Sequence, residues 1–337
     1  MIDQVSHAAS GPNADDGASS PCESDVEADS PHSAIRLFGV DFTSAPRRAK
    51  PIQVAHGLIR GSTLRVCRVE SLVEWSAFEA FLSRPGPWVG AFDFPFGLPR
   101  PLIQRLGWPD DWRQLVALVA TLGRRDFAQI LDEARQARPV GDRYLYRAGD
   151  RAAGAASPMK LVNPPVGLMF FEGAARLARA GLCILPCAPS KDSRIAVEGY
   201  PGMIARALGI RSYKRDGPEG RTTARRAERG RLLERLPHWI ASGSGLRLDL
   251  PDYVVEACID DGCGDAADAV VLLAQAAQAA RALGRNEPLA GIPAEVDPLE
   301  GWIIGTPWVN TKACSVRDEA QGVRGAATED ISSWQAR

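Results

Sequence analysis

Histidine is scarce in this sequence, with four residues among 337, and none of them lies beside a cysteine pair at the spacing of a zinc site. The seven cysteines form an odd, scattered set and not the dense pattern of a disulfide scaffold. The closer pairs, Cys183 with Cys187 and Cys258 with Cys263, are therefore interpreted as buried thiols. We expect a reducing, cytoplasmic location and no zinc chemistry.

Long apolar runs are also missing. No stretch approaches the roughly 18 consecutive apolar residues that a transmembrane helix requires. The first residues lack a basic segment followed by an apolar one, which is the pattern of a secretory signal. We therefore expect no membrane association. With 45% hydrophobic residues, the chain has enough apolar surface to bury a large α/β core.

Both ends of the chain contain few large apolar side chains. Residues 1–34 consist mainly of Ser, Asp, Ala, Gly and Pro and predict a disordered acidic tail, while residues 307–337 predict a flexible C-terminal tail. Seven of the 41 acidic residues and no Lys or Arg lie in the first tail, so the remainder has 34 acidic and 40 basic residues. The folded domain is expected over residues 35–306, with a small positive charge that favours an anionic partner.

Apolar and alternating runs predict the start of an α/β domain. Residues 35–41 form a short apolar run that ends in an acid, as a buried strand does. Residues 52–59 and 63–69 alternate on either side of a short polar turn and predict a β-hairpin. Ser71 is expected to cap a helix, and residues 88–93 predict another strand. The resulting order is β, β, β, α, β.

Residues 100–190 have mostly helical patterns and are interpreted as an insertion into this domain. The helical pattern is clearest over residues 112–122, 126–135 and 167–180. After the insertion, residues 194–198 predict a further strand. An alanine-rich helix is expected at residues 265–283, stopped by the glycine that follows.

Acidic residues recur where predicted strands end. Asp41, Asp93 and Glu198 each close a strand, and the carboxyl ends of neighbouring parallel strands open on one crevice. Asp265 and Asp268 are three residues apart and lie on one face of the last predicted helix. Carboxylates brought together in this way repel one another unless a hard divalent cation lies among them. We therefore expect a site for Mg²⁺ or Mn²⁺.

Each acid also has a simpler explanation. Asp41 and Asp93 could accept hydrogen bonds from turn amides, the second of them in a Pro- and Gly-rich bend. Glu198 could form an ion pair with a Lys or Arg close by in the sequence. Asp265 could be the N-cap residue of its helix, where an acid three residues later completes a capping box.

Five short motifs occur in order along the chain. They are Gly39-Val40-Asp41-Phe42-Thr43-Ser44-Ala45, Asp93-Phe94-Pro95-Phe96-Gly97-Leu98-Pro99, Glu198-Gly199-Tyr200-Pro201, Asp265-Ala266-Ala267-Asp268-Ala269 and Glu300-Gly301-Trp302-Ile303. Together they resemble the domain of unknown function 429 family, whose members are predicted to be RNase H-like nucleases. The similarity spans about residues 36–305.

This resemblance implies an RNase H-like fold, with a mixed five-stranded sheet flanked by helices and the strands of Asp41, Asp93 and Glu198 side by side. It implies that Asp41, Asp93 and Asp268 hold metal ions, with Asp265 or Glu198 as a fourth ligand. The predicted function is a metal-dependent nuclease, in which two divalent ions assist hydrolysis of a phosphodiester. Asp41, Asp93, Asp268 and Glu198 are its expected catalytic residues. The prediction requires that no Lys or Arg side chain occupies the space between the strand-end acids.

Basic side chains are candidates for substrate binding. Nine basic residues are concentrated in residues 211–235, and Arg225 and Arg226 among them could face a phosphate backbone. The alternative is a solvated amphipathic helix that turns its leucines inward. Lys160, in a Gly- and Ala-rich stretch, could border the substrate. A nucleic acid or a nucleotide is the expected partner.

Two other functions are compatible with the sequence. The same kind of sheet occurs in actin-like ATPases and sugar kinases, where a strand-end Asp and a hydroxyl-bearing hairpin handle the phosphates of ATP. Asp41 followed by Thr43 and Ser44 fits this pattern, so both hydroxyl residues are candidate substrate ligands. Against it, one domain of this size lacks the second half that closes over a nucleotide. The other alternative is a non-catalytic nucleic-acid-binding module.

Overall fold

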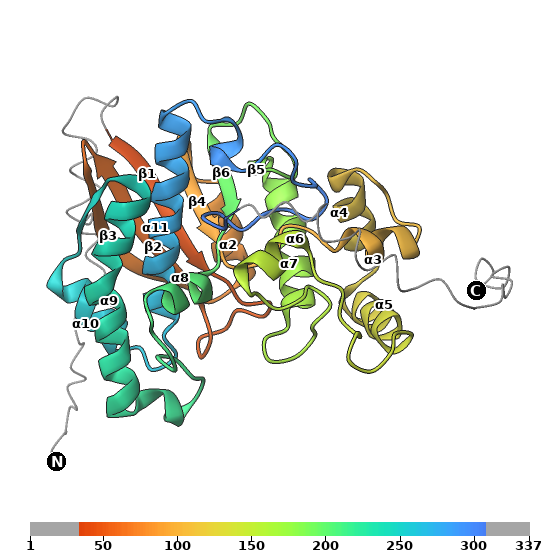
Figure 1. The fold of residues 1–337 in the computed structure, drawn as a ribbon, viewed down its shortest axis with the longest axis horizontal. Coiled ribbons are helices and arrows are strands. Elements are labelled where there is room, and N and C mark those ends of the chain that lie inside the picture. Colours follow the sequence, from red (N-terminus) through yellow and green to blue (C-terminus); the bar gives the residue numbers. More distant parts are fainter. Residues whose placement is uncertain (1–33, 308–337) are drawn as a thin grey trace, which may run out of the picture. The chain divides into compact units, whose positions relative to one another are not determined.

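A seven-stranded mixed β-sheet forms the centre of the domain in a computed structural model (Figure 1). The structure describes residues 34–307, so the predicted tails lie outside the described residues apart from one residue each. In chain order the strands are β1 (Ala34–Asp41), β2 (Ile52–Arg60), β3 (Thr63–Leu72), β4 (Trp88–Phe92), β5 (Cys183–Leu185), β6 (Arg194–Glu198) and β7 (Arg247–Asp249). Across the sheet their order is β5-β6-β4-β1-β2-β3-β7.

The middle of the sheet agrees with the sequence analysis. β1 pairs in parallel with β4, and β4 with β6, so the strands that lead to Asp41, Asp93 and Glu198 are neighbours, as predicted. β2 and β3 form the predicted antiparallel hairpin. The α/β class is confirmed, but the sheet has seven strands where five were predicted. The additional strands β5 and β7 have three residues each, which is too few to show an alternating pattern.

Helices from the second half of the chain cover one face of the sheet and form an apolar cluster with it. They are α8 (Pro201–Ala207), α9 (Thr223–Ser244), α10 (Asp252–Asp260) and α11 (Asp265–Gly284), and short 3₁₀ helices lie at Pro218–Arg221 and Pro288–Gly291. The α9 leucines Leu232, Leu233 and Leu236 are buried, as predicted for an amphipathic helix. The alanine-rich α11 lies directly against β1 at Gly39, where a Cβ atom would be 2.1 Å from the Ala269 carbonyl oxygen.

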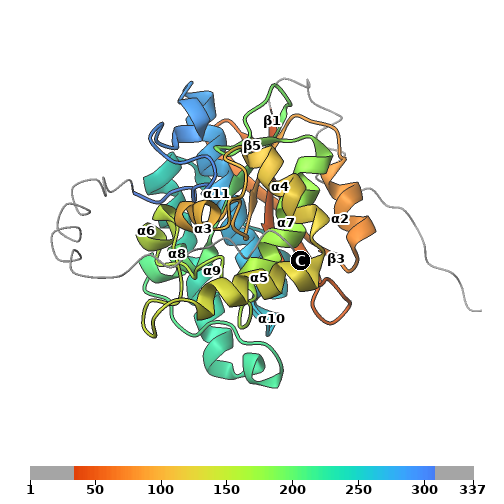
Figure 2. The same ribbon diagram turned by 90° about the vertical axis from the view of Figure 1, so that its right-hand side faces the viewer.

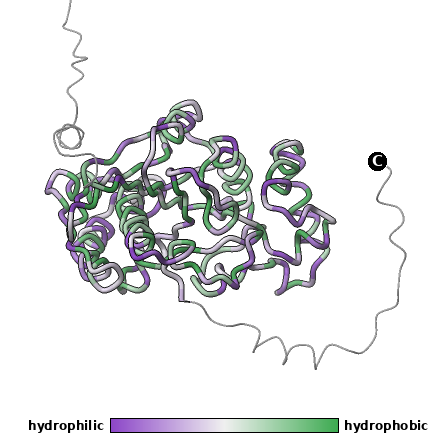
Figure 3. The backbone as a smooth tube through the Cα atoms, turned by 90° about the horizontal axis from the view of Figure 1, so that it is seen from above, coloured by the Kyte–Doolittle hydropathy of each residue, from purple (hydrophilic) through white to green (hydrophobic). Residues whose placement is uncertain are grey.

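The opposite face packs against α2 (Trp75–Leu82) and most of the helical insertion. The insertion comprises α3 (Arg100–Arg105), α4 (Trp112–Thr121), α5 (Arg124–Gln136), α6 (Ala148–Ala153) and α7 (Val166–Ala180). The predicted helices are confirmed to within two residues, and Gly181 ends α7 in the left-handed conformation. Figure 2 views the domain from the side of this insertion. In Figure 3 the helices alternate between hydrophilic and hydrophobic segments, as amphipathic helices do.

Two local expectations are wrong. Ser71 does not cap a helix, because it lies in β3 opposite Gln53 and donates a hydrogen bond from Oγ to the Gln53 side chain at 2.9 Å. Pairing with β2 continues as far as Leu72, so the sheet hydrogen bonds override the capping signal and α2 begins at Trp75. Gly284 is the last residue of α11 instead of the residue that stops it.

The described residues also bear on the expectations about thiols and membranes. Cys183, Cys187, Cys258 and Cys263 are free; the first three are buried, as predicted, whereas Cys263 is only partly buried. Cys67 in β3 is disulfide-bonded, which the scattered cysteine pattern did not predict.

Within residues 34–307, no helix has both the length and the apolar composition needed to cross a membrane.

Candidate functional site

A cavity of about 790 Å³ lies at the carboxyl ends of the central parallel strands. Asp41 ends β1, Asp93 follows β4 and Asp265 begins α11, and all three line this cavity. The sheet brings the first two together, because Val40 pairs with Phe92 and the Asp93 amide donates to the Val40 carbonyl at 3.0 Å. Acids that are far apart in the sequence therefore share one cavity.

The first turn of α11 supplies two acids. Gly264 precedes the helix in the left-handed conformation, so Asp265 is not the N-cap residue considered as an alternative. The Asp265 carboxylate pairs with Lys50 at 2.8 Å. Asp268 lies one turn further along, has no exposed surface, and accepts a hydrogen bond from the Tyr213 hydroxyl at 2.5 Å. The two acids thus differ in depth, with Asp265 at the cavity wall and Asp268 inside the protein.

Two lysine side chains neutralise part of this charge. Lys214 forms an ion pair with Asp268, and Lys50 bridges Asp265 and Asp216. The Lys214 charge also lowers the pKa values of both strand-end acids, so a basic side chain lies near them, although its ion pair is with Asp268. With Asp216 included, five acids and two lysines still leave an excess of three negative charges when all are ionised. A divalent cation would neutralise most of that excess.

The clustered carboxylates make one another harder to ionise. Burial raises the pKa of Asp93 to about 7, although the Lys214 ammonium opposes this rise. Burial also raises the pKa of Asp41 well above its usual range, with further contributions from the charges of Asp265 and Asp268. The ionised forms are therefore costly, and a cation among them would relieve the repulsion.

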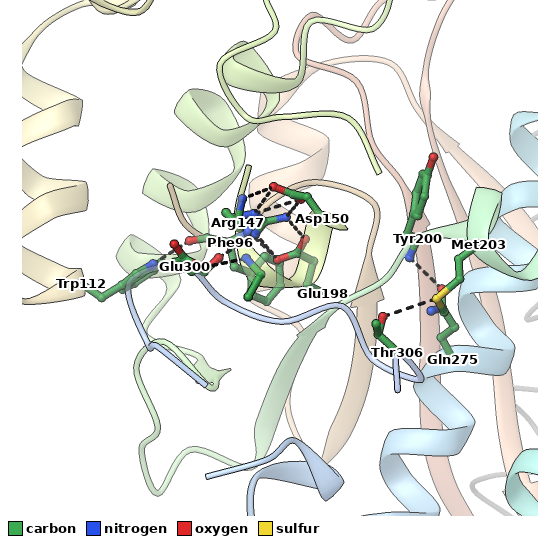
Figure 4. Close-up of polar contacts among 11 residues, drawn as sticks. Phe96, Trp112, Arg147, Asp150, Glu198, Tyr200, Met203, Gln275, Glu300 and Thr306 are labelled. Carbon is green, nitrogen blue, oxygen red and sulfur yellow. Dashed lines mark hydrogen bonds and ion pairs between the residues drawn. The ribbon is translucent and has the colours of Figure 1, made fainter. Parts of the chain in front are cut away.

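Glu198 lines the same cavity but is engaged in a buried ion-pair network with Arg147 (Figure 4). The Arg147 guanidinium donates to its two oxygens at 2.6 and 2.8 Å, and the Phe96 amide donates to Oε2 at 2.9 Å. The same guanidinium pairs with Asp150 at 2.7 Å. The strand register explains the separation from the cluster: Glu198 is level with the residue before Asp41, so its side chain leaves the sheet on the opposite face.

The Arg147 network connects segments that are distant in the sequence. Arg147 donates to the Glu300 carbonyl at 2.7 Å, and the Glu300 carboxylate accepts hydrogen bonds from the Ala148 and Arg100 amides at 2.9 and 2.8 Å. The ion pair considered for Glu198 therefore exists, but its partner comes from the insertion and not from neighbouring sequence. Because both Glu198 oxygens are engaged, this residue supports the cavity wall in the observed arrangement.

Two of the predicted substrate-binding residues, Thr43 and Ser44, line the cavity. The Ser44 hydroxyl accepts a hydrogen bond from Arg124 of α5 at 3.2 Å. Lys160 is not among the described residues that line the cavity, and its ammonium donates to the Asn163 carbonyl. The hydroxyl residues are thus placed at the acids, whereas Lys160 stabilises a loop.

The basic run reaches the cavity at its beginning. Lys214 and Arg215 line the cavity, while Arg225 and Arg226 lie on α9 outside the described lining. Arg226 pairs with Asp260 of α10 at the surface. For these two arginines the structure agrees with the alternative of a solvated amphipathic helix.

Sequence reasoning missed three residues of the site: Lys50, Tyr200 and Tyr213. Lys50 lies in the loop before β2, where no periodic pattern exists to place it. Tyr213 adjoins the first lysine of the basic run, and this proximity was the available signal. Tyr200 lies in the motif that begins with Glu198, and its place two residues after a strand-end acid could have marked it as a cavity residue.

The carboxylate oxygens of the clustered acids are suitable ligands for a hard divalent cation. Mg²⁺ and Mn²⁺ prefer carboxylate oxygens, and Mg²⁺ is commonly held by one or two carboxylates with water and substrate phosphate completing its shell. Within the described part of the chain, no group of three His, Cys, Asp or Glu side chains is already arranged around one metal position. Since Asp265 and Asp268 are engaged by lysines, Asp41 and Asp93 are the pair that would hold a cation.

Comparisons with protein-family models, with curated proteins and with solved structures give no match to this chain. The function is therefore inferred from the residues of the cavity.

Proposed function

We propose that the chain hydrolyses phosphodiester bonds with one divalent cation, Mg²⁺ or Mn²⁺, bound by Asp41 and Asp93. The observation that carries this proposal is a single cavity in which strand-end acids lie together with Lys and Arg side chains. Acids of this kind hold a cation, and basic side chains bind the phosphate that it activates. A metal-dependent hydrolase of phosphate esters needs both sets of groups in one place.

The proposal includes an RNase H-like fold and membership of the domain of unknown function 429 family. The five ordered motifs support it, as does the strand order β3-β2-β1-β4-β6 with its antiparallel β2–β3 pair. The short strands β5 and β7 would then be additions at the two edges of the sheet.

Each side chain has a separate role in this reaction. Asp41 and Asp93 would bind the cation, which supplies Lewis acidity toward the phosphate and nearby water. The positively charged side chains of Lys214 and Arg215 would bind the negatively charged phosphate oxygens. An ammonium group has three donor hydrogens, so the Lys214 ion pair with Asp268 orients the lysine and still leaves it able to bind phosphate.

Calorimetric titration with Mn²⁺ tests the cation site. We expect one Mn²⁺ per chain, and we expect Asp41→Asn to weaken binding by about 10-fold or more, because it removes a charged ligand from a buried site. Asp249→Asn is the matched control, since this acid lies in β7 and its side chain is 51% exposed. A stoichiometry of two, or equal affinity in the wild type and Asp41→Asn, would contradict the proposal.

Hydrolysis is measured on bis(p-nitrophenyl) phosphate with and without Mn²⁺. We expect cation-dependent release of nitrophenol that Asp93→Asn removes and Asp249→Asn retains. Release of phosphate from ATP without cleavage of the diester would instead favour the kinase-like alternative. Retained binding of oligonucleotides with no hydrolysis of either substrate would favour the non-catalytic module.

A further inference from the structure

Tyr200 provides an aromatic surface on the wall of the same cavity. It lies two residues after the end of β6 and immediately precedes α8, so the strand end and the helix start determine its position. Its ring rests on Gly202, where a Cβ atom would lie 2.9 Å from ring atom Cζ and 3.1 Å from Cε2. Any larger residue at position 202 would therefore displace the ring.

Two side chains, Arg206 of α8 and Gln275 of α11, hold this tyrosine in place. The Arg206 guanidinium lies over the ring at 5.3 Å from its centroid, and Arg206 is itself held by the Ala153 carbonyl. The Tyr200 amide donates to the Gln275 side chain at 2.9 Å (Figure 4). Tyr200 is thus a half-buried ring with a fixed position, supported by Gly202 and Arg206, at a cavity that also contains the acid cluster.

We propose that Tyr200 stacks an unpaired nucleobase whose adjoining phosphate reaches the strand-end acids. This inference deepens the proposed function and depends on it for the position of the phosphate. The substrate class is then single-stranded DNA or RNA, because a base within a duplex is already stacked on both faces. Stacking on a fixed aromatic ring is the usual way in which proteins bind single strands without reading their sequence.

The size and composition of the cavity agree with this substrate. A volume of about 790 Å³ lies in the range of small-molecule sites, and it suits a nucleotide unit better than a double helix. Pro165, Val166 and Met169 line the same cavity and offer apolar contacts to a planar ring. Lys214 and Arg215 supply the positive charge that a phosphate requires.

Fluorescence of 2-aminopurine tests the inference without relying on turnover. The probes are single-stranded DNA and RNA hexanucleotides with one 2-aminopurine, titrated in Ca²⁺ in place of Mg²⁺, together with the same DNA strand in a duplex. We expect quenching on binding to the wild type and to Tyr200→Phe. Tyr200→Leu should bind about 10-fold more weakly and lose the quenching, because it removes the stacked ring.

Two further variants complete the test. Gly202→Ala keeps the tyrosine but displaces its ring, so it should also lower affinity and quenching. Tyr253→Leu is the matched control, because Tyr253 is 60% exposed on α10. It should behave as the wild type does.

Equal quenching in the wild type and Tyr200→Leu would overturn the inference, and so would equal affinity for single strand and duplex. These failures are distinguishable from failure of the proposed function. If Mn²⁺ binding and diester hydrolysis depend on Asp41 and Asp93 while no probe is quenched, the stacking inference is wrong and the hydrolase stands. Tyr200-dependent quenching without any hydrolysis would support stacking and contradict the hydrolase.

Discussion

Replacement of Arg147 by methionine tests the buried ion-pair network directly. Arg147 is 2% exposed, and the side chains of its partners Glu198 and Asp150 are 3% and 0% exposed. Arg147→Met keeps an unbranched side chain and removes the charge. It leaves two carboxylates buried without the cation that compensates them.

The structure permits an estimate of the cost. Removal of one partner from a buried ion pair costs about 3–5 kcal/mol, and here one arginine serves two acids. A typical domain has a total stability of about 5–15 kcal/mol, so the variant should lose a large part of it. The hydrogen bond to the Glu300 carbonyl is lost together with the guanidinium, and only the Phe96 amide continues to stabilise the Glu198 carboxylate.

The loss of folding stability in Arg147→Met should increase as the pH rises. Burial raises the pKa of Glu198, and the Arg147 charge opposes that rise. Without Arg147 the folded-state pKa moves further above the unfolded value, so the folded protein binds a proton more readily than the unfolded chain. The fold is then least destabilised at acid pH, and stability falls as the pH rises through the folded-state pKa. The difference in unfolding free energy between the wild type and Arg147→Met is therefore larger at pH 8 than at pH 5.

Urea unfolding of the wild type and Arg147→Met at pH 5 and pH 8 measures this difference. Arg285→Met is the control, because its ion pair with Glu287 is exposed and screened by water and should contribute little to stability. Arg147→Met combined with Glu198→Gln should recover part of the loss, since one uncompensated charge is gone. A loss below about 1 kcal/mol at pH 8, or a loss that is the same at both pH values, would refute the reasoning.

Two other predictions concern the acids and the close contact of α11. Burial raises the pKa of Asp93 from 3.8 to about 7 and also raises the pKa of Asp41. Calorimetry should therefore show Mn²⁺ affinity falling by at least about 10-fold per pH unit below pH 7, and a constant affinity between pH 5 and 7 would contradict this. In the cation-free protein the Asp93 carboxyl stabilises the fold below about pH 4, and this contribution is lost as the pH rises through 7. Gly39→Ala would place a Cβ atom 2.1 Å from the Ala269 carbonyl oxygen and should lower the free energy of unfolding in urea by about 3 kcal/mol or more. Gly284→Ala, whose Cβ atom would have no neighbour within 4 Å, is the control and should change that free energy by less than about 0.5 kcal/mol. Similar values for the two variants would disprove the close contact.

The central strands could be predicted because their signal is local. In β1, Leu37 and Val40 are buried on opposite faces of the sheet, and a strand buried on both faces appears in the sequence as an unbroken apolar run. An acid at the end of such a run, as with Asp41, marks the edge of the sheet where ligands bind. The placement of Asp41 and Asp93 at one cavity followed from this pattern and from the parallel pairing of their strands.

The positive charges could not be placed in the same way. Lys50 and Lys214 approach the acids from loops, and Arg147 lies 51 residues before its partner Glu198. Such contacts depend on how separate segments pack, and no periodic pattern encodes them. Glu198 lies one residue before the level of Asp41 and Asp93 in the sheet, and this offset decides its role. A shift of one position moves a side chain to the other face of a strand.

The segment around Glu300 closes the cavity although it comes almost at the end of the domain. Ile303 lines the cavity, and Glu300 accepts hydrogen bonds from the Arg100 and Ala148 amides, so the walls depend on residues near the end of the described range. A nascent chain that already contains Asp41, Asp93 and Asp268 would still lack this part of the enclosure. The hydrolytic activity proposed here would therefore require the chain to be folded through this segment.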